Sequence, residues 1–215
     1  MRQSQQQWIR TWPVVLVALA VVGCSNTGPD RTATAVESFK DTRKHLADAS
    51  KQVGVTNDSL RALSAGGGDL RPLFDKYVAN VKRTQDMAEG ARKRAEAMRA
   101  KTDEYTKQWQ KELSAISDEQ LRAQSQQRVA AAKAEFDRVR SAAAEVKAAY
   151  QPYRQGLNDV QQYLTNDLTA AGVQSVGTKA NDTIRKGETL QQRIADLERE
   201  LNSLSSKWSA KLGGA

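Results

Sequence analysis

The most regular pattern in the chain lies within residues 129–164, where apolar residues recur at alternating spacings of three and four. The positions between them are mostly charged or amide side chains. This heptad spacing is typical of a helix that buries one narrow seam against neighbouring helices, as in a coiled coil. The seam positions are Val129, Ala132, Phe136, Val139, Ala143, Val146, Tyr150, Tyr153, Leu157, Val160 and Leu164.

A first helix with the same spacing is expected to begin at Asp30, whose carboxylate can cap the helix N-terminus. Gly54 is expected to interrupt this helix, and residues 57–59 can cap a short second piece. The seam positions before the glycine are Ala35, Phe39, Thr42, Leu46, Ala49 and Val53.

A second helix is expected after the three glycines at 66–68, which favour a turn because glycine has no side chain to pack. Asp69 is its expected N-cap, and the heptad spacing continues to Ile116. Residues 116–119 contain a capping pair, so we expect a tight reversal there into the helix of residues 129–164.

Pro152 lies inside that helix and predicts a kink near residues 148–150. Residues 165–172 mix Asn, Asp, Thr and Gly and are expected to form the second reversal. The last helix is then expected over 173–211, with residues 212–215 as a disordered tail.

These segments predict an all-α fold, an elongated antiparallel coiled-coil bundle of three long helices plus a shorter N-terminal helix, in one domain at 31–211. The chain has only 12 aromatic residues, three Phe, five Tyr and four Trp. Long helices that share a narrow apolar stripe need no larger aromatic core. A heptad pattern does not fix how many chains assemble, so the sequence is also compatible with a homo-oligomer.

The N-terminus carries the pattern of a secretory signal. An apolar run at 13–22 follows a basic segment without acids. Such a run is too short to span a bilayer, which takes about 20 residues, but it suits a signal peptide. It ends in Val21-Val22-Gly23-Cys24, which resembles the bacterial lipobox. The resemblance implies cleavage between Gly23 and Cys24 and a diacylglyceryl group on the Cys24 thiol.

The expected organisation is therefore a lipoprotein signal peptide at 1–23 and an acylated tether at 24–30, held to the membrane by several acyl chains. The alternative is an uncleaved signal anchor with an incidental cysteine. Ser25 stands where an Asp resembles the inner-membrane retention signal. The expected location is thus the periplasmic face of the outer membrane, or the cell membrane if there is only one.

The net charge of +8 favours an acidic partner. In the expected compartment this partner is an envelope protein or a cell-wall polymer, besides the membrane that holds the acyl chains. Nucleic acid is not an expected partner there.

Candidate catalytic chemistry is sparse. His45 is the single histidine, and neither a cysteine nor a paired carboxylate accompanies it at metal-ligand or dyad spacing. The glycines at 66–68 lack the lysine of a phosphate-binding loop. We therefore expect no catalytic residues, no metal site and no cofactor other than the lipid on Cys24, and we do not expect an enzyme.

One stretch of the second helix is unusually basic. Only Glu89 and Glu96 lie near it as acids. It is a candidate membrane-binding or partner-binding face, and the alternative is an ordinary solvated helix face. Its basic residues are Arg92, Lys93, Arg94, Arg99 and Lys101.

Several short motifs together resemble a bacterial family of helical lipoproteins that is catalogued as a domain of unknown function. The resemblance spans about residues 33–208 and implies a helical fold, without catalytic residues or a cofactor. The motifs are Val36-Glu37-Ser38-Phe39, Gly67-Gly68-Asp69-Leu70, Asp75-Lys76-Tyr77, Trp109-Gln110-Lys111-Glu112-Leu113, Pro152 and Tyr163-Leu164-Thr165-Asn166-Asp167-Leu168.

Two functions follow from these features. The first is a lipid-anchored periplasmic rod that acts as a structural or protein-interaction element without catalysis. The alternative is a membrane-surface-binding or membrane-curving three-helix module, in which the proline kink supplies curvature and the basic stretch attracts anionic lipid.

Overall fold

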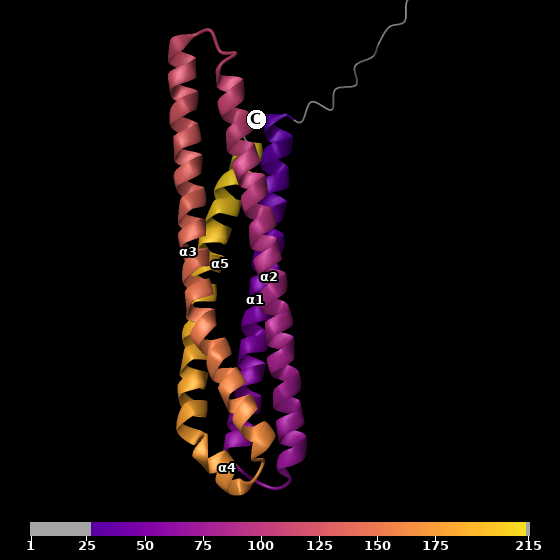
Figure 1. Ribbon diagram of the computed structural model, residues 1–215. Helices are drawn as coiled ribbons and strands as arrows, with labels where there is room; N and C mark the ends of the chain where they lie inside the picture. Colours follow the sequence, from indigo (N-terminus) through magenta and orange to yellow (C-terminus); the bar gives the residue numbers. More distant parts are fainter. Residues whose placement is uncertain (1–26, 214–215) are drawn as a thin grey trace, which may run out of the picture.

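The computed structural model describes residues 27–213, and over that range the chain is helical apart from short turns. Four long helices run alternately in opposite directions, and a short helix lies in the last turn (Figure 1). The all-α antiparallel bundle expected from the sequence is confirmed. The helices are α1 (Gly28–Ser64), α2 (Leu70–Leu113), α3 (Glu119–Asn166), α4 (Ala170–Ser175) and α5 (Gly177–Gly213).

The long helices form a ring in which each contacts the two beside it. α1 packs closely against both α2 and α5, and α3 packs closely against α5. The contact between α2 and α3 is the least extensive of the four. In Figure 1 these two helices separate in the middle of the bundle, and α5 is visible between them. The bundle is therefore more open along the α2–α3 side.

α1 begins earlier than the sequence predicted. Thr27 and Asp30 form a reciprocal capping box, in which the Asp30 N–H donates to Thr27 Oγ1 at 3.4 Å and the Thr27 N–H donates to Asp30 Oδ2 at 3.1 Å. Pro29 lies in the first turn, where its missing N–H breaks no helical hydrogen bond. Residues 28–30 are thus helical and do not belong to the expected tether.

α1 also continues without a break through Gly54, so the predicted interruption and the separate short piece are wrong. A glycine inside a helix costs only about 0.5–1 kcal/mol. The burial of Val53, Leu60 and Leu63 around it outweighs that cost. α1 consequently has 37 residues, as many as α5 and fewer than α2 or α3, so the expected shorter N-terminal helix fits roughly.

The turns between the long helices use the expected caps. Asp69 Oδ1 accepts from the Arg71 N–H at 3.0 Å, and Asp118 Oδ1 accepts from the Leu121 N–H at 2.8 Å. Gly66 and Gly68 have φ angles of 58° and 71°, a region that glycine enters without steric cost. α2 ends at Leu113, earlier than predicted, which leaves residues 114–118 as the connection to α3.

The last reversal contains a helix that the sequence did not predict. The Thr169 hydroxyl accepts from the Gly172 N–H at 3.0 Å and starts α4 inside the stretch that was expected to be a turn. α5 therefore begins at Gly177, later than the predicted start at residue 173. It extends to Gly213, two residues past the predicted end.

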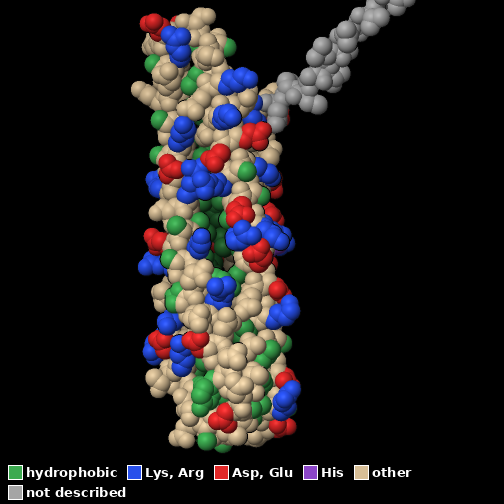
Figure 2. All heavy atoms as spheres, viewed as in Figure 1, with side chains coloured by type: hydrophobic (Ala, Val, Ile, Leu, Met, Phe, Trp, Pro, Cys, Tyr) green, Lys and Arg blue, Asp and Glu red, His purple; other side chains and the backbone are tan. Residues whose placement is uncertain are grey.

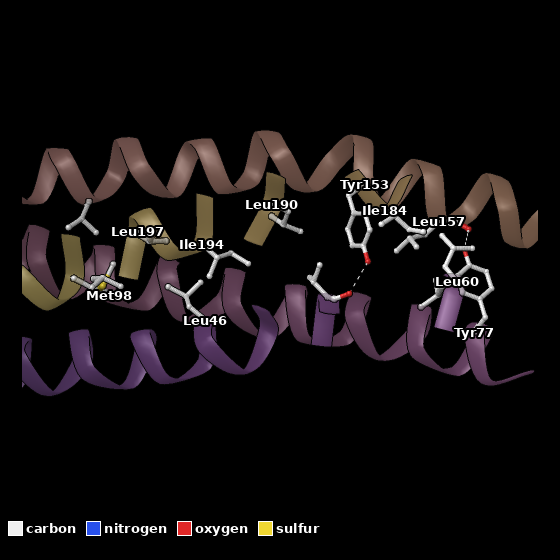
Figure 3. Packing of buried hydrophobic residues seen from close by; sticks show 14 of the residues in the cluster. Leu46, Leu60, Tyr77, Met98, Tyr153, Leu157, Ile184, Leu190, Ile194 and Leu197 are labelled. Carbon is white, nitrogen blue, oxygen red and sulfur yellow. Dashed lines mark hydrogen bonds between the residues drawn. The ribbon is translucent and has the colours of Figure 1, made fainter. Parts of the chain in front are cut away.

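The predicted seams form the core. In α3 the middle of the seam is half-buried and its two ends are buried. In α5 the residues with the same heptad spacing are buried: Ala180, Thr183, Leu190, Ile194, Leu197, Leu201, Leu204 and Trp208. Figure 3 shows several of the buried side chains, among them Tyr153, Leu157 and Leu190, pointing into the space between the helices. α3 is uninterrupted at Pro152, but Figure 1 shows it changing direction in its lower half, as expected for a helix that contains proline.

An aromatic cluster fills the half of the core that is close to the start of α1. The Trp208 ring centroid lies 6.0 Å from that of Phe39 and 5.0 Å from those of Tyr105 and Phe136. Trp208 is only 1% exposed, and its Nε1–H donates to Glu135 Oε2 at 2.9 Å. Residues from all four long helices thus meet around one indole ring.

The start of α1, the end of α5 and the α2–α3 turn all lie at one end of the bundle (Figure 1). The Arg31 guanidinium and the Glu112 carboxylate are 2.7 Å apart and join α1 to the last turn of α2. Figure 1 shows that the α2–α3 turn projects beyond the start of α1. We call residues 113–121, which form this projection, the hairpin tip.

Candidate functional site

The residues of the predicted lipidation site, Gly23 and Cys24, lie outside the described part of the chain, so acylation of Cys24 stays a prediction. The first described residue is Thr27, which caps α1. Residues 25–27 therefore separate Cys24 from Gly28, the first residue of α1.

The predicted basic face lies on the middle of α2, and carboxylates surround most of it. Arg92 pairs with Glu89 at 2.7 Å and with Glu96 at 2.5 Å, and Lys93 lies 3.8 Å from Glu89. The hydrogen bond from Arg92 lowers the pKa of Glu89, and the same contacts raise the pKa of Arg92. These charges are held on the helix that carries them and offset one another.

Of the other three basic residues of this face, two have a carboxylate partner and one does not. Arg94 Nε lies 3.4 Å from Asp41 Oδ2 on α1, and Arg99 Nε lies 3.6 Å from Asp103 Oδ2. Lys101 has no carboxylate within ion-pair distance among the described residues. The structure thus places the five residues along one helix, but it leaves less uncompensated positive charge there than the sequence suggested.

A groove of about 570 Å³ runs beside this face, between α1 and α2. Arg94 and Lys101 lie on its α2 side, and Glu37 and Asp41 on its α1 side. The walls therefore carry two charges of each sign, and small side chains line the remainder. Such a groove has no net charge to select an anionic or a cationic ligand.

A second groove, of about 360 Å³, lies between α2 and α3. Arg140 spans it by donating to Asp103 on α2 and to Asp137 Oδ1 on its own helix at 2.9 Å. Figure 2 shows a hollow between the columns of charged side chains on this face, with hydrophobic side chains at its base. The lining residues are Asp103, Thr106, Lys107, Gln110, Lys133, Phe136, Asp137 and Arg140.

His45 lies on α1, and its Nε2 is 3.4 Å from Asp41 Oδ1 one turn earlier. This is a local contact on the helix surface, with one carboxylate. Within residues 27–213, no three His, Cys, Asp or Glu side chains come together as a metal-binding group.

A layer of buried polar side chains crosses the half of the core away from the aromatic cluster, and the sequence interpretation missed it. Asn57, predicted as part of a helix cap, is 1% exposed inside α1. It accepts a hydrogen bond from the Tyr153 hydroxyl at 3.0 Å and donates to the Ile184 carbonyl at 3.3 Å. The seam position of Tyr153 was visible in the sequence, but nothing there indicated that Asn57 faces it.

Tyr77 supplies a second hydrogen bond in this half of the core. Its hydroxyl donates to the Leu157 carbonyl on α3 at 2.7 Å (Figure 3). Burial raises the pKa of both Tyr77 and Tyr153, so both phenols stay protonated and act as donors. These buried bonds fix the register of α3 against α1 and α2, because a slipped helix would leave polar groups unpaired.

Burial raises the pKa of the Glu198 carboxyl on α5, although the nearby Arg43 acts in the opposite direction. Its Oε1 atom is buried without a hydrogen-bond donor among the described residues. The Glu198 carboxyl therefore binds a proton more tightly in the folded protein than in the unfolded chain. The contribution of Glu198 to stability falls as pH rises above the ordinary carboxyl pKa. We expect Glu198→Gln to raise the free energy of unfolding at pH 7 by about 0.5 kcal/mol.

Urea unfolding of both proteins from acidic to neutral pH measures this difference. The increase in the free energy of unfolding caused by Glu198→Gln should become smaller toward acidic pH, where the glutamic acid is itself protonated. A gain that is equal at all pH values would contradict the assigned cause.

Comparison with known proteins places the chain in a family but adds no activity. The model of a family described as "Protein of unknown function (DUF2959)" matches residues 24–208. No curated protein and no solved structure matches the chain. No helix within residues 27–213 is both long and apolar enough to cross a membrane. The match covers most of the chain and agrees with the family resemblance of its motifs, and we conclude that the chain belongs to the DUF2959 family of proteins of unknown function.

Proposed function

We propose that this protein is a lipoprotein of the outer membrane, held at the periplasmic face by acyl chains on Cys24, and that its bundle acts as a structural or protein-interaction rod without catalysis. In a cell with one membrane, the same anchor would hold it to that membrane. Its partner would be an envelope protein or a cell-wall polymer.

The observation that carries this proposal is the position of the α1 N-terminus. α1 begins at one end of the elongated bundle, four positions after Cys24. An anchor at that cysteine would hold the rod by one end and leave its sides free for other molecules. The family match also starts at residue 24, which excludes the 23 residues expected to be cleaved.

The sides of the rod suit contact with other macromolecules better than binding of a small molecule. Both grooves are open and have charged walls, and neither is an enclosed apolar pocket of the kind that binds small ligands. Charged side chains of both signs are spread along the face of the rod that Figure 2 shows.

The anchor is tested with the variant Cys24→Ser. We expect the wild-type protein to be found in the membrane fraction, with an N-terminal peptide whose mass includes the acyl chains. The variant should lose this modification, because a serine hydroxyl cannot form the thioether to the lipid. Fractionation and mass spectrometry of the N-terminal peptide measure both effects.

Ser25→Ala is the matched control, and it should leave acylation unchanged. A wild-type N-terminal peptide with a free Cys24 thiol would overturn the proposal, and so would equal membrane association of Cys24→Ser and wild type. The interaction role is tested in the same cells with photo-crosslinkers on exposed positions along the rod. A discrete crosslinked product from one face supports that role, and a lack of products from all faces contradicts it.

The membrane-curving alternative has weaker support. It requires uncompensated positive charge near Arg92, but four of the five basic residues there have carboxylate partners. Paired surface charges attract an anionic bilayer less than free ones.

A further inference from the structure

The hairpin tip differs in composition from the rest of the rod. Its first five residues, 113–117, contain no charge, and the charged residues of the tip are the exposed acids Asp118 and Glu119. The two larger apolar side chains that remain accessible there are Ile116, which is partly buried, and Leu121, which is 56% exposed. Leu121 is the most exposed large hydrophobic side chain among the described residues.

The tip also holds its shape. Asp118 caps α3, and Arg122 Nη1 donates to the Ile116 carbonyl at 3.3 Å. Below the tip, Trp109 Nε1 donates to Ser125 Oγ at 3.2 Å and fixes the register of the two helices. The exposed leucine is therefore presented from a braced turn.

The tip lies at the end of the rod that an anchor on Cys24 would bring to a membrane. The four Cα–Cα steps from Cys24 to Gly28 span at most about 14 Å. The tip projects beyond the start of α1 at this same end (Figure 1). A rod tethered on so short a segment has only this end within easy reach of the lipid surface.

We propose that the hairpin tip is a second membrane contact, in which Leu121 and Ile116 enter the interface of the lipid bilayer that holds the acyl anchor. This inference rests on the proposed lipidation of Cys24. The two side chains that enter the bilayer are apolar, and the exposed charges beside them, Asp118 and Glu119, are acidic. The contact therefore does not depend on attraction to anionic lipid, unlike a contact through the basic face of α2.

Two apolar side chains would not bind a free protein to a membrane. They need not do so, because an anchored protein has already lost its freedom in three dimensions and its tip is present at a high effective concentration near the surface. A small gain from burying Leu121 then determines orientation, and the rod stands on the bilayer at two points. Its sides and its far end point away from the lipid.

The test uses the acylated full-length protein in phosphatidylcholine vesicles, with a single added cysteine that carries an environment-sensitive fluorophore. Cys24 is the only cysteine of the chain, so after acylation the added thiol is the only one free to react. The labelled variants are Ser117→Cys at the tip, Lys93→Cys in the middle of α2 and Gly67→Cys in the far turn. Spin-labelled phosphatidylcholine should quench most of the emission at residue 117 and little of it at residues 93 and 67.

Leu121→Ser in the Ser117→Cys protein should remove most of this quenching. Val55→Ser is the matched control, since Val55 is a similarly exposed apolar residue on α1, and it should change nothing. Equal quenching at residues 93 and 117 would show a rod lying flat and would overturn the inference. An absence of quenching at residue 117 in vesicle-bound protein would overturn it too.

Failure of the anchor itself gives a different result. If Cys24 is not acylated, the protein without an added cysteine reacts with the fluorophore, and this result contradicts the proposed function. If that protein does not react and residue 117 stays unquenched, the anchor stands and only the tip contact is wrong.

Discussion

Replacement of Trp208 with alanine is expected to lower the free energy of unfolding by about 3–5 kcal/mol, the usual cost of removing a large buried aromatic side chain. Trp208 is 1% exposed and contacts aromatic rings from α1, α2 and α3. Its loss would leave a cavity where all four long helices meet. The stability is measured by urea unfolding followed by circular dichroism.

Trp208→Phe separates the ring contacts from the hydrogen bond. Phenylalanine retains part of the aromatic packing but cannot donate to Glu135, so we expect a smaller loss, about 1–2 kcal/mol. The matched control is Trp109→Ala, because Trp109 is only partly buried and should cost less than Trp208→Ala. Equal losses for the two alanine variants would contradict a central role for Trp208.

Gly187→Ala is expected to lower the free energy of unfolding by about 1–3 kcal/mol through overpacking. A Cβ atom at this position would lie 2.6 Å from Asn57 Nδ2 and 2.8 Å from Tyr153 Cε2. Both groups are buried and hydrogen-bonded to each other, so neither can move aside cheaply. The effect is opposite to the gain that the same change gives in an ordinary helix.

Gly90→Ala provides that ordinary case on α2. The nearest atom to its added Cβ is the end of the Arg94 side chain at 3.6 Å, so we expect a gain of about 0.5–1 kcal/mol from helix propensity. Thermal unfolding of both variants shows whether each substitution raises or lowers the stability of the protein. A stabilising effect of Gly187→Ala would show that α5 can move away from Asn57 and would contradict the close packing described above.

A double-mutant cycle identifies the partner in the clash. If Asn57 is the main obstacle, Gly187→Ala should cost less in the Asn57→Ala protein than in the wild type. An unchanged cost would place the strain on Tyr153.

Much of the fold could be predicted from the sequence, because the signals involved are local. The apolar spacing from Val129 to Leu164 indicated which face of α3 is buried. Asp69 and Asp118 marked the starts of two helices, since a carboxylate next to free backbone N–H groups stabilises a helix N-terminus wherever the helix packs. The motif ending in Cys24 is local in the same sense, and its lipidation stays a prediction.

Other features depend on which residues meet across helices, and only the tertiary structure decided them. Gly54 and Asn57 both resembled a break in a helix, but packing against α5 and α3 keeps α1 continuous and buries the asparagine. Among the basic residues of α2, Arg94 is paired with Asp41 on α1, a partner that no spacing within α2 indicates. The projection of the hairpin tip beyond the start of α1 likewise follows from the relative lengths and positions of three helices (Figure 1).

The sequence by itself thus determined the long helices, the caps at Asp69 and Asp118 and the buried faces, because periodicity and capping act within one or two turns of the chain. The tertiary structure decided the registers, the paired charges and the exposed end of the rod. These depend on distances between residues that are up to 169 positions apart in sequence, as between Phe39 and Trp208. Such distances are set by the packing of whole helices, and no short segment of the chain encodes them.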